Sequence, residues 1–245
     1  MIRAGLPALT LGAALLLPAG GVMAQEVTFS LGDGESLSVR TIQLIVLITV
    51  LSLAPGLAIM ITCFPFIVTV LAILRQGIGL QQSPPNMLIV SLALFLTYFV
   101  MEPVFTEAWT TGIDPLLQER IGVETAVARA LEPFRVFMAG RVETDTFNAL
   151  AALRPATADL APTAEAPLSV LVPSFLLSEI ARAFQIGFLI FLPFLIIDLV
   201  VAAILMSMGM MMVPPVVVSL PFKLAFFVIA DGWTLVADSL VRGYF

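Results

Sequence analysis

The sequence predicts an all-α membrane protein, because it has few charges and three long stretches without any. Of its 245 residues, 60% are hydrophobic and 11% are charged, whereas soluble domains carry about 25% charged residues. Residues 41–74, 76–101 and 199–222 contain no Asp, Glu, Lys or Arg. A helix needs about 20 apolar residues to cross a bilayer, so each stretch is long enough. With the apolar segment after residue 222, the chain is expected to have about four hydrophobic spans.

The composition argues against catalysis, metal binding and nucleic-acid binding. The chain has no histidine, which removes Ser-His-Asp and Cys-His catalysis and the common zinc sites. Cys63 is the one cysteine, so it has no disulfide partner and is expected to be a small buried hydrophobe. A formal net charge of −6 without a basic patch disfavours nucleic acid. We therefore expect no enzyme, no cofactor and no metal.

Residues 1–24 have the pattern of a secretory signal peptide. Arg3 provides a positive start, residues 9–17 form a short apolar core, and residues 22–24 resemble a small-residue cleavage site. The core is too short to span a bilayer, which favours cleavage over the alternative of an uncleaved first membrane helix. Cleavage would leave the slightly acidic segment 25–40 in the periplasm.

The hydrophobic region 41–104 is expected to run inward and then back out. Arg75 and an acid-free loop separate its two uncharged stretches, and Lys and Arg favour the cytoplasmic side. Residues 105–168 then hold nine acidic residues and five arginines, with apolar residues at three- and four-residue spacing. This segment is expected to be a periplasmic helical region, broken or kinked at Pro133, with a loop over residues 153–167.

The region 169–245 is expected to hold a helix of more than thirty residues, about 50 Å long, with a kink at Pro193. Glu179 and Arg182 stand three residues apart and can pair on one face, the alternative being a solvated helix end. Asp198 lies among apolar residues and is expected to face protein or a pore, because a carboxylate facing lipid is costly.

Lys223 and Asp231 interrupt the apolar segment that follows, and a spacing of eight residues puts them on neighbouring helix faces without direct contact. Either Lys223 extends toward a lipid headgroup, or both side chains reach groups on other subunits. The two helical segments are expected to meet at the turn MSMGMMMVPP, residues 206–215, which carries no charge. Irregular backbone at membrane depth needs protein around it or a cavity beside it. The turn is thus either a packing turn or an apolar seal that closes a pore.

Two stretches carry a resemblance to the FliP family, the flagellar type III export gate proteins whose virulence-system relatives are called SctR. They are PSFLLSEIARAFQIGF, residues 173–188, and PFLIIDLVVAAILMSMGMMMVPPVVVSLPFKLAFFVIADGW, residues 193–233. The Asn-Met pair in SPPNMLIVSLALFLTYFVM also fits, and Ala203 departs from the Ser that the family pattern predicts. The likeness covers nearly the whole chain after the leader, with the middle segment the least diagnostic part.

The resemblance implies two long helical hairpins with a helical periplasmic region between them. It further implies a ring of five copies, completed by FliR-type and FliQ-type subunits and working with FlhB- and FlhA-type proteins. Unfolded flagellar proteins would pass through this ring at the basal body, in the inner membrane. Carried over to this chain, the family's methionine gasket falls on Met210, Met211 and Met212. The charged residues would lie at subunit interfaces or be buried: Glu179, Arg182, Asp198, Lys223 and Asp231.

Two alternatives to a conduit are a proton-coupled transporter and a purely structural nucleus of basal-body assembly. The transporter would carry protons on Asp198 and Asp231, but the sequence shows no internal repeat of the kind transporters commonly have. The structural nucleus differs from the conduit in predicting no leak when the methionines are trimmed.

Overall fold

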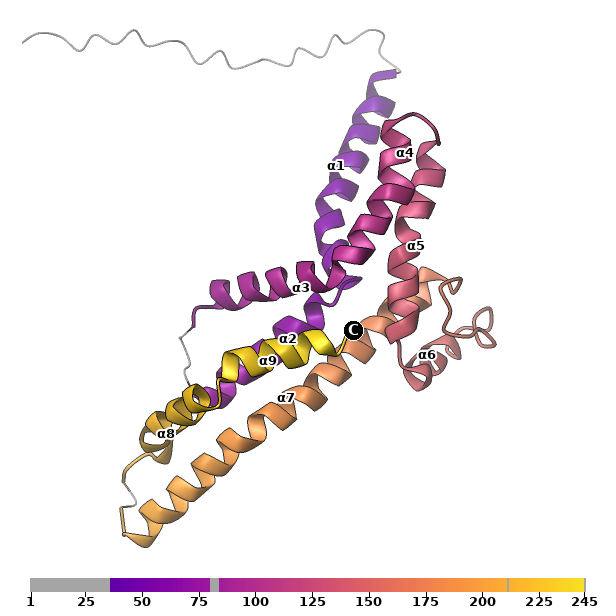
Figure 1. The fold of residues 1–245 in the computed structure, drawn as a ribbon. Coiled ribbons are helices and arrows are strands. Elements are labelled where there is room, and N and C mark those ends of the chain that lie inside the picture. Colours follow the sequence, from indigo (N-terminus) through magenta and orange to yellow (C-terminus); the bar gives the residue numbers. More distant parts are fainter. Residues whose placement is uncertain (1–35, 80–83, 211, 245) are drawn as a thin grey trace, which may run out of the picture. The chain divides into compact units, whose positions relative to one another are not determined.

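A computed structural model describes residues 36–79, 84–210 and 212–244 (Figure 1). The chain divides into two compact units, Met1–Ile48 and Thr49–Phe245. In the first unit only the start of helix α1 belongs to the described part. The signal peptide predicted at residues 1–24 lies outside the described residues.

The described residues form helices and no strands, so the chain is an all-α membrane protein, as predicted. Three helical stretches are long and apolar enough to cross a membrane, Arg40–Met60, Asn86–Leu117 and Leu168–Ser207, and a bent pair near the C-terminus makes a fourth candidate. The helices are α1 Ser36–Met60, α2 Phe64–Ile78, α3 Asn86–Ala108, the π-helix η1 Trp109–Ile113, α4 Asp114–Leu117, α5 Val123–Arg141, α6 Thr144–Ala151, α7 Leu168–Ser207, α8 Pro215–Ile229 and α9 Gly232–Arg242.

The uncharged stretch 41–74 is not one straight helix, because α1 ends at Met60 and α2 begins at Phe64. Pro65 occupies the first turn of α2, where its missing N–H and fixed φ are compatible with a helix start. Cys63 precedes that turn and is fully buried, which confirms its expected place in the core. The break makes α2 a separate helix that packs against the other helices of the second unit.

Helix α2 is the centre of the larger hydrophobic core. Its buried side chains include Phe66, Ile67, Leu71 and Leu74. Helix α7 lies directly against it, because Gly187 has no side chain: a Cβ there would come within 2.4 Å of the end of Ile73. Helices α3, α7 and α8 pack directly against α2, and α9 packs against α3 and α8 (Figure 1).

The middle segment is helical, and residues 153–167 form the predicted loop. Helix α5 continues from Val123 to Arg141, so the predicted break at Pro133 does not occur, and the alternative of a kink there stays a prediction. Arg135 holds the loop, because its guanidinium donates to the carbonyls of Ala164 and Ala166 at 2.9 and 3.0 Å. A second core cluster forms where this region meets the start of α7, with Phe147 and Phe175 at its centre.

Helix α7 spans 40 residues, so it is about 60 Å long, and Pro173 and Pro193 lie inside it without ending it. The apolar segment after the methionine turn is two helices. Helices α8 and α9 meet at an angle of 62°, and Asp231 between them adopts the left-handed conformation, with φ 49°.

Candidate functional site

The methionine-rich turn joins α7 to α8 where the sequence predicts it. Gly209 has φ 73°, a conformation that glycine adopts at no steric cost. Its N–H donates to the carbonyl of Met206 at 3.1 Å, and the N–H of Met210 donates to the carbonyl of Leu205 at 3.0 Å. These two bonds are the Schellman pattern that ends a helix and reverses the chain. The double proline follows, with Pro215 at the first position of α8.

The turn presents its described methionines outward. Met212 is 98% exposed and Met210 is 41% exposed, while Met211 lies outside the described residues. Met206 and Met208 are exposed as well. Methionine is flexible and adapts to irregular apolar surfaces. An uncharged turn that exposes such side chains is suited to contacts with apolar groups outside its own chain.

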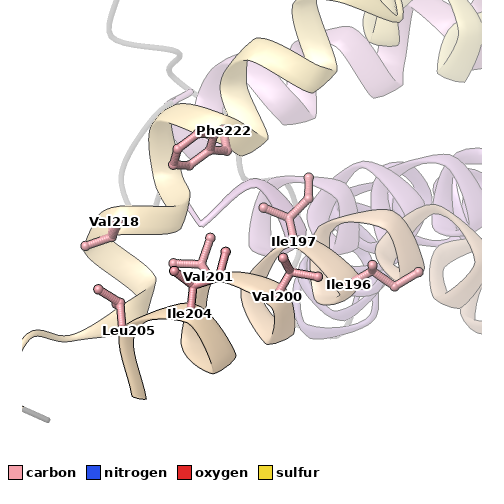
Figure 2. A pocket seen from close by; sticks show the side chains of 8 residues that line it. All are labelled: Ile196, Ile197, Val200, Val201, Ile204, Leu205, Val218 and Phe222. Carbon is pink, nitrogen blue, oxygen red and sulfur yellow. The ribbon is translucent and has the colours of Figure 1, made fainter. Parts of the chain in front are cut away.

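The hairpin that carries the turn has an apolar groove between its arms. The groove has a volume of about 390 Å³, and Figure 2 shows the side chains that line it. All of them are apolar: Ile196, Ile197, Val200, Val201, Ile204 and Leu205 from α7, and Val218 and Phe222 from α8. This groove therefore offers no polar side chain to a ligand.

A partly buried ion pair fastens the two arms of the hairpin to α2. Lys223 Nζ lies 2.6 Å from Asp198 Oδ2 and donates to the carbonyl of Gly77 at 3.1 Å. Ser219 donates its hydroxyl to the other carboxylate oxygen of Asp198 at 2.5 Å. Lys223 is 3% exposed, so its ammonium lies inside the chain and does not extend outward to the membrane surface. Asp198 faces protein, which is one of the two surroundings expected for it.

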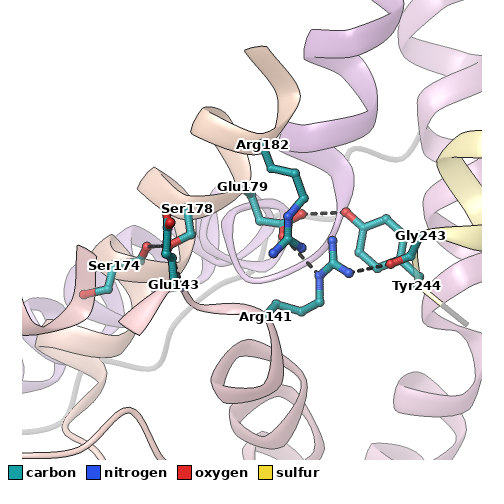
Figure 3. Close-up of polar contacts among 8 residues, drawn as sticks. All are labelled: Arg141, Glu143, Ser174, Ser178, Glu179, Arg182, Gly243 and Tyr244. Carbon is teal, nitrogen blue, oxygen red and sulfur yellow. Dashed lines mark hydrogen bonds and ion pairs between the residues drawn. The ribbon is translucent and has the colours of Figure 1, made fainter. Parts of the chain in front are cut away.

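Glu179 is the centre of a second buried cluster, shown in Figure 3. Its side chain is fully buried and accepts from Arg141 Nε at 3.2 Å and from Arg182 Nη1 at 3.5 Å. The pairing with Arg182 that the spacing allowed is therefore present, while Arg182 stays partly exposed. The hydroxyl of Tyr244 donates to the second oxygen of Glu179 at 2.5 Å. A buried carboxylate needs such donors to offset the loss of water.

Sequence reasoning missed Arg141 and Tyr244, although they complete this cluster. The guanidinium of Arg141 lies 4.0 Å from the centre of the Tyr244 ring and donates to the carbonyl of Gly243 at 2.6 Å. The ring also contacts Phe66 and Phe137. Burial raises the pKa of the Tyr244 phenol, and the neighbouring Glu179 carboxylate raises it further, so the phenol stays a hydrogen-bond donor. No local sequence pattern predicts these contacts, because they join residues far apart in the chain.

Asp231 plays a different part from the other predicted charges. It is exposed and makes no ion pair with any described residue. Its carboxylate accepts from the hydroxyl of Thr234 at 3.1 Å, at the start of α9. The bend at this residue also means that the helical spacing between Lys223 and Asp231 does not apply across it. The Asp-Gly pair at residues 231–232 is the sequence feature that could have predicted this bend, because such pairs mark turns.

Comparisons with known proteins give a consistent result. The family model described as FliP family matches residues 47–240. The chain is 50% identical over 236 residues to the Flagellar biosynthetic protein FliP of Caulobacter vibrioides, a match that covers 95% of this chain and 87% of that protein. It is 51% identical over 199 residues to the protein of that name from Rhizobium meliloti, covering 81% of each. For the Bacillus subtilis protein of that name, identity is 45% over 217 residues, covering 88% of this chain and 97% of that protein.

Proposed function

The chain belongs to the FliP family of flagellar biosynthetic proteins, and from this membership we propose that it is the pore-forming core subunit of the flagellar export gate. As a family member it is a membrane protein of the flagellar export apparatus. In the proposed function it conducts unfolded flagellar proteins across the inner membrane and performs no catalysis of its own.

The exposed methionine turn is the observation that carries this proposal. Met210 and Met212 project from a tight, uncharged turn at the tip of a long hairpin. If several copies bring their turns together, the side chains of Met210, Met211 and Met212 form an apolar ring. Such a ring closes a pore to water and ions by dewetting, and flexible methionines can yield around a passing chain.

The surrounding assembly follows the family resemblance. We propose a ring of five copies, completed by FliR-type and FliQ-type subunits, with FlhB- and FlhA-type proteins nearby. The buried clusters around Glu179 and Lys223 hold each copy in shape. The partly exposed Arg182 and the exposed Asp231 are the charges best placed to reach neighbouring copies.

The test replaces Met210, Met211 and Met212 with alanine in cells that make the whole apparatus. We expect a leak of small ions across the inner membrane while the gate complex assembles normally, because alanine is too short to close the ring. Leak and complex assembly are measured in the same cells.

A matched variant separates the seal from a general effect of removing methionines. Met206→Ala with Met208→Ala removes the two exposed methionines that precede the triplet in the same turn, and we expect no leak from it. No leak from the triple variant with assembly intact would mean that the seal lies elsewhere or that the protein is only a structural nucleus. Loss of assembly would identify the triplet as a packing element.

A further inference from the structure

A polar cavity lies at the C-terminal end of α2, between that end and helices α7 and α8. Its volume is about 430 Å³, far more than the roughly 30 Å³ that one water occupies in the liquid. Its lining differs from the apolar groove of the hairpin, because it contains three charged side chains: Arg75, Asp198 and Lys223. Gln76, Gly79, Phe191 and Val216 complete the wall.

The cavity has a surplus of positive charge. Arg75 and Lys223 are two cations, and Asp198 is the one carboxylate in the lining, which leaves a net charge of one positive. Asp198 is already paired with Lys223 at 2.6 Å. Arg75 makes no ion pair with any described residue, and the adjoining stretch LQQS, residues 80–83, contains no acid. Its described hydrogen bonds go from Nη1 to the side-chain oxygen of Asn86 and the carbonyl of Pro84, both of them neutral.

The cavity also has a surplus of hydrogen-bond donors. Lys223 has three N–H groups and uses two of them, on Gly77 and Asp198. A Cβ added to Gly79 would lie 3.8 Å from Lys223 Nζ, which places the ammonium beside the cavity wall. Arg75 has five N–H donors, and its Nε and Nη2 make no hydrogen bond with the described residues. The carboxylate of Asp198, by contrast, accepts on both oxygens.

We propose that this cavity binds a phosphate group between Arg75 and Lys223. A ligand with negative charge and several acceptor oxygens would neutralise the net positive charge and accept hydrogen bonds from the unused N–H donors. The planar fork of Arg75 suits paired phosphate oxygens, and Lys223 adds a point charge.

A phospholipid headgroup is the expected source of the phosphate. Arg75 is the one charge between residues 41 and 101, so the cavity adjoins helices with apolar outer faces. Basic pockets between membrane helices bind anionic lipid headgroups. Free phosphate has the same chemistry, so the experiment must separate the two sources.

The experiment uses the full chain purified in dodecyl maltoside. Three probes are added in turn: dimyristoyl phosphatidylglycerol, dimyristoyl phosphatidylcholine and inorganic phosphate. Binding is followed by native mass spectrometry and by the shift in melting temperature. We expect phosphatidylglycerol to bind more tightly than phosphatidylcholine and Arg75→Gln to weaken that binding by at least about tenfold. Arg120→Gln, which removes an exposed arginine outside the cavity, is expected to leave it unchanged.

A second variant protects the test against misfolding of the first. Gln76→Glu leaves Arg75 in place and adds a carboxylate at the exposed edge of the cavity, so it should weaken phosphatidylglycerol binding as well. Binding of inorganic phosphate that depends on Arg75 would support the site with free phosphate as the source. The proposal is overturned if no probe binds, or if Arg120→Gln weakens binding as much as Arg75→Gln. Arg75 would then be left for an acidic segment of a partner protein.

Discussion

At the scale of single residues, the buried charges of Glu179 and Lys223 hold helices of this chain together through their partners. Glu179 is fully buried and receives donors from Arg141, Arg182 and Tyr244. Removing one partner from a buried ionic group is costly, because the remaining charge loses its compensation without regaining water. Tyr244 is the most informative of these donors, since a single hydroxyl can be deleted while the ring stays in place.

Tyr244→Phe is expected to lower the free energy of unfolding by about 1–3 kcal/mol, because Glu179 loses a donor in a buried position. Thermal unfolding of the purified chain in detergent measures the effect. Tyr98→Phe is the matched control, since Tyr98 is 63% exposed and should change stability little. Equal effects of the two variants would show that the hydroxyl of Tyr244 contributes nothing specific.

The difference between wild type and Tyr244→Phe should also depend on pH. The folded state raises the pKa of the Tyr244 phenol, whereas the unfolded phenol has a pKa of about 10. Above that pH the unfolded chain releases a proton that the folded chain keeps, so the wild type loses stability as the pH rises. Its advantage over Tyr244→Phe should therefore be full below about pH 9 and should narrow above about pH 10.

At the scale of elements, tertiary contacts override the local effect of proline. Pro133 removes the N–H that would bond the carbonyl of Arg129, yet α5 is continuous. The hydroxyl of Thr111, in η1, donates to the carbonyl of Glu107 at 2.8 Å and lies 3.4 Å from the carbonyl of Arg129, close enough to share its hydrogen. Helix η1 approaches this closely because Gly112 has no side chain. A Cβ on Gly112 would lie 2.7 Å from the Cβ of Ala130 and 2.8 Å from the carbonyl oxygen of Ala126.

Gly112→Ala is therefore expected to destabilise the chain by about 1–3 kcal/mol, because the obstructing atoms belong to the backbone and first side-chain atom of α5. Gly140→Ala is the matched control within α5. A Cβ there would meet nothing within 4 Å, so it should stabilise the chain by about 0.4–1 kcal/mol. Thermal unfolding of both variants in detergent measures the effect. A neutral Gly112→Ala variant would contradict the close packing of η1 on α5.

At the scale of the whole molecule, the apolar outer faces indicate that the chain functions within lipid and among other chains. Exposed apolar side chains occur along α3 and α7, including Phe95, Phe99, Phe184 and Phe188. The partly buried pair of Asp198 and Lys223 keeps the hairpin of α7 and α8 in a shape that can join such an assembly. A proton-coupled transporter would instead require Asp198 to carry protons.

Asp198→Asn is expected to reduce the amount of assembled gate complex, with export falling in proportion to it. The variant weakens the attraction to Lys223 and costs up to about 3 kcal/mol of folding free energy. Complex assembly on native gels and secretion of flagellar proteins are measured in the same cells. Asp238→Asn is the matched control, because it removes an exposed pair with Arg242 and such pairs contribute little. Complete loss of export with normal assembly would favour the transporter.

The sequence by itself determined the helical membrane class, the uncharged methionine turn and the loop at residues 153–167, because composition and helical periodicity are local properties. It also allowed the Glu179–Arg182 pair, which are three residues apart. It placed Lys223 and Asp231 on neighbouring faces of one helix, which is wrong, because the left-handed Asp231 turns the chain there by 62°.

Only the tertiary structure decided which groups compensate the buried charges. Glu179 meets Arg141 and Tyr244 across 38 and 65 residues, and Lys223 meets the carbonyl of Gly77 across 146 residues. No local pattern encodes such pairs, because helix packing brings them together. Close approaches at Gly112 and Gly187 are equally non-local, since they depend on the neighbouring helix. The sequence indicates that a buried charge needs a partner, but the packing of the helices determines which residue is that partner.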